Sequence, residues 1–307
     1  MSRATLRVAA AQLAGCGEGL EANTERARQA VRDAAVAGAE LVVLPELTVL
    51  PYFCGEAVEA YRDWAEPLDG PIVSGFSALA AELGVTVVLG HFELDVAHGT
   101  RHNAAVVLGT DGAILAAVDR DGVARPVSRK LHLPVGDDPP PGFDEAAHFT
   151  PGEALGVHDP EGLRLGCLVC YDRRFPECWR ELRALDARLV AVPVAGSGGD
   201  GAAFMIAELR THARENGLVA ICAGKVGTEW VGGRPVENIG SSCVIGVDGA
   251  VVAHRPAADG PGLVLADVDL DEITAARSRW RYFDHRRTDL FGGPSPVPRA
   301  DLEAHPA

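Results

Sequence analysis

The sequence predicts an α/β fold made of two similar halves, in which two sheets pack together and helices lie outside. Strand-like and helix-like segments alternate along the chain, a pattern that is typical of α/β proteins. Three stretches of the first half also recur about 150 residues later: LRVAAAQL at 6 as LRLGCLVC at 163, AELVVLPEL at 39 as ARLVAVPVA at 187, and VVLGTDGAILAAV at 106 as CVIGVDGAVVAHR at 243. The Asp-Gly turns of the last two stretches indicate a hairpin in each half. We therefore expect one domain with two pseudo-symmetric halves.

The first half is expected to contain two strand–helix units and then two strands. A strand over 5–13 leads into a helix that runs to about Ala37, because apolar residues recur there at helical spacing and Asn23 is suited to cap its start. A short buried strand at 41–44 is ended by Pro45. The following elements are a helix at about 74–83, which ends at Gly84, and strands at 85–93 and 103–108.

The second half is expected to repeat this order after a long polar and proline-rich loop at 134–152. Its expected elements are a strand at 163–170, a helix from Pro176 to about Leu185, a strand at 188–194, a helix at about 203–215, a strand at 218–224, and strands near 240–246, 250–254 and 263–268. The domain is expected to span 1–290. The tail at 291–307 is expected to pack poorly or to form an arm onto a partner subunit.

The composition restricts the partners and the compartment. A formal net charge of −15 at pH 7 argues against nucleic acid or an anionic membrane as the main partner. An anionic small substrate stays compatible with it, because charges more than about 8 Å away are largely screened. The N-terminal residues lack the apolar core of a secretory signal, and no run of about 20 apolar residues is present. Seven cysteines at irregular spacing fit reduced thiols, so a cytoplasmic protein is expected.

Cys170, within GCLVCYDRRFPE at 166–177, has three open interpretations. If 163–170 is a strand, Cys167 and Cys170 point to opposite faces, which argues against a metal-binding or redox CxxC pair. An inert buried thiol is the usual state of a cysteine in an apolar strand. A nucleophile is the third interpretation, because Cys170 stands at the carboxyl end of a strand and before a helix, whose N–H groups would lower its pKa and hold an oxyanion.

A nucleophilic cysteine needs a base, and no residue alone identifies itself as that base. His212 lies inside a predicted helix one turn after Glu208, where an ion pair is the simpler interpretation. Glu46 follows a buried strand, at a position equivalent to that of the cysteine, yet by itself it suits an ordinary capping or solvated glutamate. Lys130 by itself suits a surface lysine, and the role of His132 stays open.

Three motifs taken together change this interpretation. LPEL with Glu46, RKLHLP with Lys130 and CYDRRFPE with Cys170 closely resemble, in this order, the three signatures of the nitrilase (carbon–nitrogen hydrolase) superfamily, and the likeness covers residues 5 to about 290. The resemblance implies a four-layer αββα sandwich and a Glu-Lys-Cys triad. Glu145, in GFDEAAHFTPG, is similar to a second glutamate of the family. The resemblance also implies a homodimer or higher homo-oligomer and no metal or organic cofactor.

The chemistry that this resemblance implies begins when Glu46 takes the thiol proton and Cys170 attacks a carbonyl or nitrile carbon. Lys130 and the backbone N–H of Tyr171 would stabilise the oxyanion. Glu46, assisted or positioned by Glu145, would protonate the departing nitrogen and then activate the water that hydrolyses the thioester acyl-enzyme.

The substrate is suggested by DRR after the cysteine, HLP after Lys130 and AGKVGTE at 223–229, which look most like the N-carbamoyl amino acid amidohydrolases, including the D-specific enzymes. That likeness implies that Arg173 and Arg174 grip a substrate carboxylate, to which a guanidinium fork is suited, and that His132 lines the pocket. The expected reaction converts an N-carbamoyl amino acid to the amino acid, carbon dioxide and ammonia.

Other interpretations of the same residues stay open. One or both arginines can form a structural salt bridge with a nearby carboxylate, for which Asp172, Glu177 and Glu181 are candidates. The short glycine-rich AGSGGDGAAF at 195–204 and LTVLPYF after Glu46 depart from the carbamoylase pattern. An ω-amidase-like enzyme, or an amidase of small aliphatic carboxamides, is therefore the alternative. A nitrilase or a non-catalytic binding member is less favoured, the latter because all four chemical residue types are present.

Overall fold

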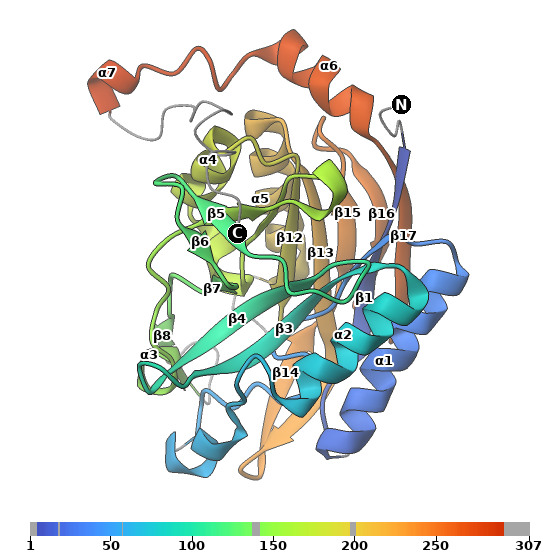
Figure 1. Cartoon of the computed structure of the whole chain (residues 1–307), viewed down its shortest axis with the longest axis vertical. Coiled ribbons are helices and arrows are strands. Elements are labelled where there is room, and N and C mark those ends of the chain that lie inside the picture. The colour runs from blue at the N-terminus through green and yellow to red at the C-terminus, as the bar shows by residue number, and fades with distance from the viewer. Residues whose placement is uncertain (1–4, 18, 57, 137–141, 197–200, 292–307) are drawn as a thin grey trace.

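The computed structural model describes residues 5–17, 19–56, 58–136, 142–196 and 201–291, and its first half alternates strands and helices (Figure 1). The elements are β1 (Thr5–Ala14), α1 (Leu20–Val36), β2 (Leu41–Val43), α2 (Pro71–Leu83), β3 (Thr86–Asp95) and β4 (Thr100–Leu108). β1, β2 and β3 pair in parallel, and β4 runs antiparallel to β3.

The second half has the same order and the same strand directions. Its elements are β11 (Leu165–Cys167), α4 (Pro176–Ala184), β12 (Leu189–Val194), α5 (Gly201–Asn216), β13 (Val219–Val231) and β15 (Ser242–Ile245). β11, β12 and β13 pair in parallel, and β15 runs antiparallel to β13. The expectation of two pseudo-symmetric halves is therefore confirmed.

The remaining elements extend and connect these two sheets. They are β5 (Ala117–Asp119), β6 (Ala124–Arg125), β7 (Ser128–Arg129), β8 (Val135–Gly136), β9 (Phe143–Asp144), α3 (Glu145–His148), β10 (Gly156–His158), β14 (Arg234–Ile239), β16 (Val251–Arg255), β17 (Gly262–Asp269), α6 (Leu270–Trp280) and α7 (Thr288–Phe291), with short 3₁₀ helices η1 (Val58–Ala60), η2 (Arg62–Trp64), η3 (Pro160–Gly162), η4 (Cys170–Arg174) and η5 (Ala257–Asp259). β17 lies antiparallel beside β1, and β10 lies antiparallel beside β11. The two sheets join where the ends of β1 and β13 pair in parallel.

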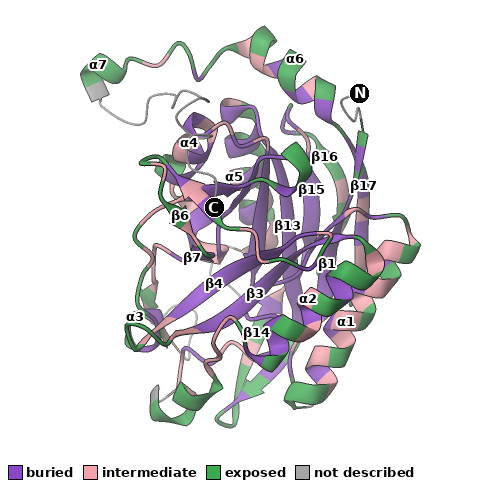
Figure 2. Ribbon diagram, viewed as in Figure 1, coloured by how far each residue is buried: buried purple, intermediate pink, exposed green. Residues whose placement is uncertain are grey.

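Three apolar cores hold four layers together. Neighbouring residues of a strand point to opposite faces, so each sheet can bury both of its faces. The inner core lies between the sheets and includes Val8, Leu41, Val88, Leu165, Leu189 and Ile221. One outer core packs the first sheet on α1 and α2, and the other packs the second sheet on α4 and α5. Figure 2 shows the buried central strands. The predicted α/β fold, a four-layer αββα sandwich, is confirmed.

One predicted helix start is wrong. The residue before α1 is Gly19, and Asn23 lies buried one turn inside the helix. Its side-chain amide instead donates from Nδ2 to the carbonyl oxygen of Val49 at 3.1 Å, which ties α1 to the segment after β2. Asn23 therefore has a tertiary partner that periodicity cannot reveal.

Two further differences from the expectation affect the site. The strand expected at 163–170 is shorter, because β11 ends at Cys167 and Cys170 begins η4. The loop expected at 134–152 contains the β8–β9 hairpin and α3, which starts at Glu145. Both departures matter for the site, because they set the direction of the Cys170 and Glu145 side chains.

The chain leaves the sandwich after β17. Helix α6 follows directly, and the chain then runs outward to α7 (Figure 1). The predicted tail at 291–307 lies outside the described residues beyond its first position. In the part of the chain that is described, no helix combines the length and the apolar character needed to cross a membrane.

Candidate active site

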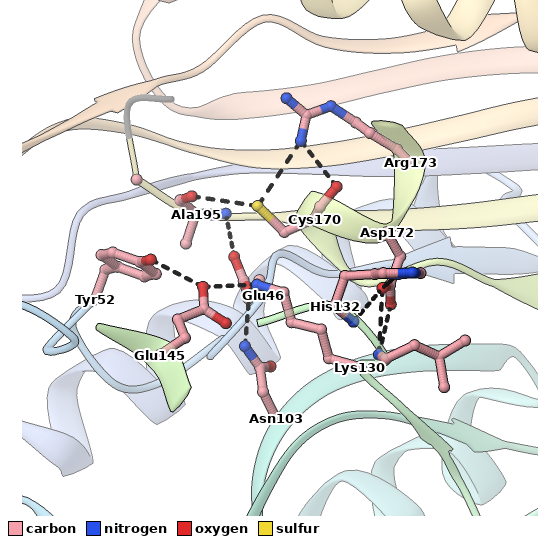
Figure 3. A network of polar contacts seen from close by, with 12 residues as sticks. Glu46, Tyr52, Asn103, Lys130, His132, Glu145, Cys170, Asp172, Arg173 and Ala195 are labelled. Atoms are coloured by element: carbon pink, nitrogen blue, oxygen red, sulfur yellow. Dashed lines mark hydrogen bonds and ion pairs between the residues drawn. The ribbon is translucent and has the colours of Figure 1, made fainter. Parts of the chain in front are cut away.

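Glu46 lies just past the end of β2 and is completely buried. Its Oε1 accepts hydrogen bonds from Asn103 Nδ2 at 2.7 Å and from Lys130 Nζ at 2.9 Å, and its Oε2 accepts one from the backbone N–H of Ala195 at 2.9 Å (Figure 3). These donors come from β4, from the residue after β7 and from the residue after β12. Both sheets therefore fix the position of this carboxylate.

The turn that carries Glu46 packs tightly against β3. Thr48 Oγ1 donates to the carbonyl oxygen of Pro45 at 2.7 Å and accepts from the N–H of Gly90 at 3.1 Å. Leu47 has a φ of 45°, a left-handed conformation that costs a non-glycine residue energy. A Cβ on Gly90 would stand only 2.2 Å from the oxygen of Pro45. Glycine is thus required at position 90 for this close approach.

Lys130 is fully buried between two carboxylates. Besides Glu46, its Nζ donates to Glu145 Oε1 at 2.7 Å. Burial opposes the charge, but Glu145 and Glu46 outweigh it, so the pKa of Lys130 is well above its usual value. The ammonium therefore stays charged and holds both carboxylates in place.

Glu145, at the start of α3, is a carboxyl group with an unusually high pKa. Burial raises the pKa of Glu145 to about 7; Lys130 opposes this rise and Glu46 adds to it. Its Oε1 also accepts a hydrogen bond from the hydroxyl of Tyr52 at 2.8 Å. Among the described residues, its buried Oε2 has no hydrogen-bond partner. Glu145 can therefore exchange a proton near neutral pH.

Cys170 lies where η4 begins, with a φ of 48°. Strained left-handed residues of this kind cluster at active sites. Its Sγ contacts the carbonyl oxygen of Ala195 at 3.7 Å and Arg173 Nη1 at 3.9 Å. Ala195 thus contacts the thiol through its oxygen and Glu46 through its nitrogen. Tyr171 follows directly in the same turn.

The expectation that a helix start lowers the thiol pKa is wrong for this structure. Burial, followed by the negative charge of Glu46, raises the pKa of Cys170 to about 12, and the cations Lys130 and Arg173 do not compensate. The group is consequently a neutral thiol at neutral pH. It needs a base to react, and the carboxylates beside it are of the type that can serve.

Asp172 connects the cysteine turn to the lysine segment. This buried carboxylate accepts hydrogen bonds from the backbone N–H groups of Leu131 at 3.2 Å and His132 at 2.9 Å, and lies 2.8 Å from His132 Nδ1. The His132 ring also stacks on Phe175, with ring centroids 3.6 Å apart. Asp172 is therefore bonded to this segment rather than to an arginine, and His132 is held beside the site with about a third of its side chain exposed.

The two arginines after the cysteine have different surroundings. Arg173 is buried, and its Nη1 donates to the carbonyl oxygen of Cys170 at 2.8 Å. Arg174 is more exposed and lies over the rings of Tyr171 and Phe204. Both arginines pair with Glu208 of α5 at 3.6 Å. The structural carboxylate is thus Glu208, a residue outside the three candidates considered from the sequence.

The site residues lie within a region that matches a known protein family. The model of the carbon–nitrogen hydrolase family matches residues 7–278. The chain belongs to the carbon–nitrogen hydrolase family. It is therefore a hydrolase of carbon–nitrogen bonds other than peptide bonds, and the predicted superfamily is confirmed.

Several relatives of this carbon–nitrogen hydrolase are amidases. The N-carbamoylputrescine amidase of Arabidopsis thaliana is 29% identical, over 90% of this chain and 91% of the relative. The deaminated glutathione amidase of Rattus norvegicus is 31% identical, over 90% and 80%. The crystal structure of a carbon–nitrogen hydrolase from Helicobacter pylori G27 has a TM-score of 0.80 at 29% identity, over 94% and 97%.

One solved relative bears directly on the thiol. A mutant amidase from Nesterenkonia sp. AN1, in which the acetamide moiety of fluoroacetamide is covalently added to the active-site cysteine, has a TM-score of 0.72 at 26% identity, over 94% of this chain and 97% of that one. A cysteine nucleophile in this carbon–nitrogen hydrolase is consistent with that adduct.

Sequence reasoning brought together Glu46, Lys130, Glu145 and Cys170, and the fold places them in one buried cluster. It missed the side chains that hold this cluster: Tyr52, Asn103, Asp172 as a partner of 131–132, and Glu208 as a partner of the arginines. It also assigned the wrong partner to His212, whose Nδ1 lies 3.1 Å from Glu215 and not beside Glu208. A motif match could have suggested none of these contacts, because each joins segments distant in the sequence or, for His212, one of two acidic neighbours on the same helix face.

Replacing Gly90 by alanine should displace the Glu46 turn of this hydrolase. The new Cβ would overlap the backbone of Pro45, so we expect unfolding to become easier by about 1–3 kcal/mol and kcat/KM to fall by up to about 100-fold. Thermal unfolding and steady-state kinetics measure the two effects. Gly17→Ala, at a glycine with no atom within 4 Å of a new Cβ, is the matched control. Full activity of Gly90→Ala would show that the turn tolerates displacement.

Proposed function

We propose that this enzyme hydrolyses an N-carbamoyl amino acid to the amino acid, carbon dioxide and ammonia, with Cys170 as the nucleophile. The observation that carries the proposal is the buried cluster in which Lys130 bridges Glu46 and Glu145 beside a neutral thiol. A thiol in this state cannot attack by itself, and a fixed carboxylate in the same cluster supplies the base.

The first step forms a bond between Cys170 Sγ and the carbamoyl carbon. Glu46 accepts the thiol proton as the bond forms, and the carbonyl oxygen becomes an oxyanion. Lys130 has three N–H donors, of which two go to Glu46 and Glu145, so one is available to the oxyanion together with the N–H of Tyr171. The site thus offers positive charge where negative charge develops.

The intermediate then collapses and the bond to the amino-acid nitrogen breaks. That nitrogen takes the proton held by Glu46, with Glu145 as positioning group or second proton donor, and leaves as the free amino acid. A carbamoyl thioester remains on Cys170. Water, deprotonated by the same carboxylates, hydrolyses it to carbamate, which decomposes to carbon dioxide and ammonia.

The substrate carboxylate is assigned to Arg174 in this proposal. Arg173 is turned inward to the carbonyl of Cys170, whereas Arg174 is about one-fifth exposed and extends over Tyr171 and Phe204. A guanidinium in that position suits a carboxylate. His132, with about a third of its side chain exposed, would contact the carbamoyl end of the substrate. Support for the carbamoyl group comes from the N-carbamoylputrescine amidase relatives.

The second candidate is an amidase of carboxylate-bearing ω-amides. The deaminated glutathione amidase relatives favour it, and the same Arg174 could bind the carboxylate of such a substrate. The two candidates share the chemistry at Cys170 and differ only in the group bonded to the scissile carbonyl.

Ammonia release from a substrate panel tests the proposal. The panel holds N-carbamoyl-D- and L-amino acids, N-carbamoyl-β-alanine, N-carbamoylputrescine, ω-amides and simple nitriles. Turnover of N-carbamoyl amino acids supports the first candidate. Turnover of ω-amides alone selects the second, and turnover of N-carbamoylputrescine alone contradicts the need for a carboxylate.

Arg174→Ala should raise KM for a carboxylate substrate by about 10- to 100-fold, because a charge-assisted hydrogen bond is lost. For the corresponding substrate amide, in which a neutral group replaces the carboxylate, KM should be the same in the variant and in the wild type. Steady-state kinetics on this pair of substrates is the measurement. An equal effect on both substrates would show that Arg174 acts on the fold rather than on the carboxylate.

A further inference from the structure

A second buried ion pair lies outside the catalytic cluster. The chain has only two lysines: Lys130 is in the cluster and Lys225 is on β13. Lys225 Nζ lies 3.0 Å from Glu229 Oε1, and both side chains are completely buried. A buried ion pair is often no more stabilising than apolar residues of similar size. Its presence therefore calls for an explanation other than stability.

Two further hydrogen bonds of this pair go to the segment that follows Glu46. Glu229 Oε2 accepts from the backbone N–H of Tyr52 at 2.8 Å, and Lys225 Nζ donates to the carbonyl oxygen of Leu50. Glu229 Oε1 also accepts from the N–H of Cys16 at 2.7 Å. The pair thus binds β13 to the backbone of residues 50–52 and to the end of β1.

Tyr52 carries this connection into the catalytic cluster. Its hydroxyl donates to Glu145 Oε1, the same oxygen that accepts from Lys130. Burial and the nearby Glu145 carboxylate raise the pKa of Tyr52 well above its usual value, so the hydroxyl remains a donor. With Oε1 engaged twice, Oε2 is the carboxyl oxygen left without a partner among the described residues.

We propose that Lys225 and Glu229 are positioning residues that hold Tyr52 on Glu145 Oε1, so that Oε2 is the oxygen presented to the reacting groups. The inference rests on the proposed function, in which Glu145 takes part in proton transfer. The Tyr52 hydrogen bond favours the ionised carboxyl group. Loss of any member of this chain should therefore make Glu145 harder to ionise.

The test uses protein labelled with ¹⁵N at lysine Nζ, which gives side-chain signals from two lysines only. The Lys130 signal should shift as Glu145 ionises, with a midpoint near pH 7 in the wild type. Tyr52→Phe should raise the midpoint by about one pH unit and lower kcat/KM about tenfold. Glu229→Gln should move the midpoint in the same direction. The double variant should move it no further than Tyr52→Phe alone, because both changes act through one hydrogen bond.

A second variant removes the ion pair. Lys225→Met/Glu229→Leu replaces it by apolar side chains and leaves Lys130 as the only labelled lysine. Because the N–H groups of Cys16 and Tyr52 and the carbonyl group of Leu50 lose their side-chain partners, the variant should unfold at a lower temperature, and its titration is recorded after circular dichroism has shown that it is folded. It should show the raised midpoint. Tyr282→Phe, which removes the hydroxyl of a tyrosine with no role here, should leave the midpoint unchanged.

An unchanged midpoint in folded Lys225→Met/Glu229→Leu, or additive shifts in the double variant, would overturn the positioning role. Failure of the proposed function would be seen separately, as wild-type protein that hydrolyses nothing on the panel. The titration of Lys130 needs no substrate and would still decide whether Tyr52 and the pair act on Glu145.

Discussion

Cys170→Ala is expected to abolish hydrolysis, with kcat lowered on the order of 10⁵-fold or more. The proposed reaction requires the covalent intermediate. In this proposal the buried carboxylates deprotonate the thiol first and activate water only against the thioester, not against a substrate that is not bonded to Cys170. Stability should change by only about 1 kcal/mol, since one partly buried sulfur atom is removed. The left-handed backbone at this position is equally strained in both proteins.

Two measurements separate chemistry from folding. Ammonia release should disappear in Cys170→Ala, while the thermal unfolding curve stays close to that of the wild type. Cys178→Ala is the matched control, because this buried thiol lies 4.0 Å from His132 and has no part in the reaction. Comparable activity losses in the two variants would point to damage to the fold and would contradict a nucleophile at position 170.

Local patterns were enough to predict the layers of this protein. The apolar runs that become β2 and β12, each after a helix, repeat at equivalent places in the two halves, and the strand pairing is the same in both. Glu46 follows β2, whose counterpart in the second half is β12, whereas Cys170 follows β11, the counterpart of β1. The expectation that the two residues occupy equivalent positions is therefore wrong, although each lies past the carboxyl end of a parallel strand. The motif residues could be combined into one site before any contact was known because their three motifs together resemble the signatures of the nitrilase superfamily.

The electrostatics of the site could not be predicted in the same way. The expectation of a lowered thiol pKa considered only the helix that follows Cys170, whereas burial and Glu46 control the pKa in the folded protein. Likewise, the arginines were paired with carboxylates near them in sequence, but Glu208 reaches them from α5. Contacts between distant segments determine both properties, and such contacts cannot be inferred from a single sequence.

Lys130→Met is expected to eliminate activity and to destabilise the fold by about 3–5 kcal/mol at pH 8, because it leaves two buried carboxylates without their cation. Lys130 is also the group that holds the pKa of Glu145 down against burial, so that pKa should rise further in the variant. Urea unfolding of both proteins between pH 4 and pH 8 is the measurement.

The sign of the pH dependence follows from linkage. A carboxyl group whose folded pKa lies above its unfolded value of about 4.3 costs stability as the pH rises between the two values. In the wild type Glu145 already binds a proton below about pH 7, so the deficit of Lys130→Met should be nearly constant there and should grow above pH 7, where Glu145 is ionised in the wild type but still protonated in the variant. Adding Glu145→Gln should recover part of the stability and flatten the curve without restoring hydrolysis. A deficit independent of pH would mean that Lys130 supports the fold through packing alone, and that the two carboxylates do not depend on its charge.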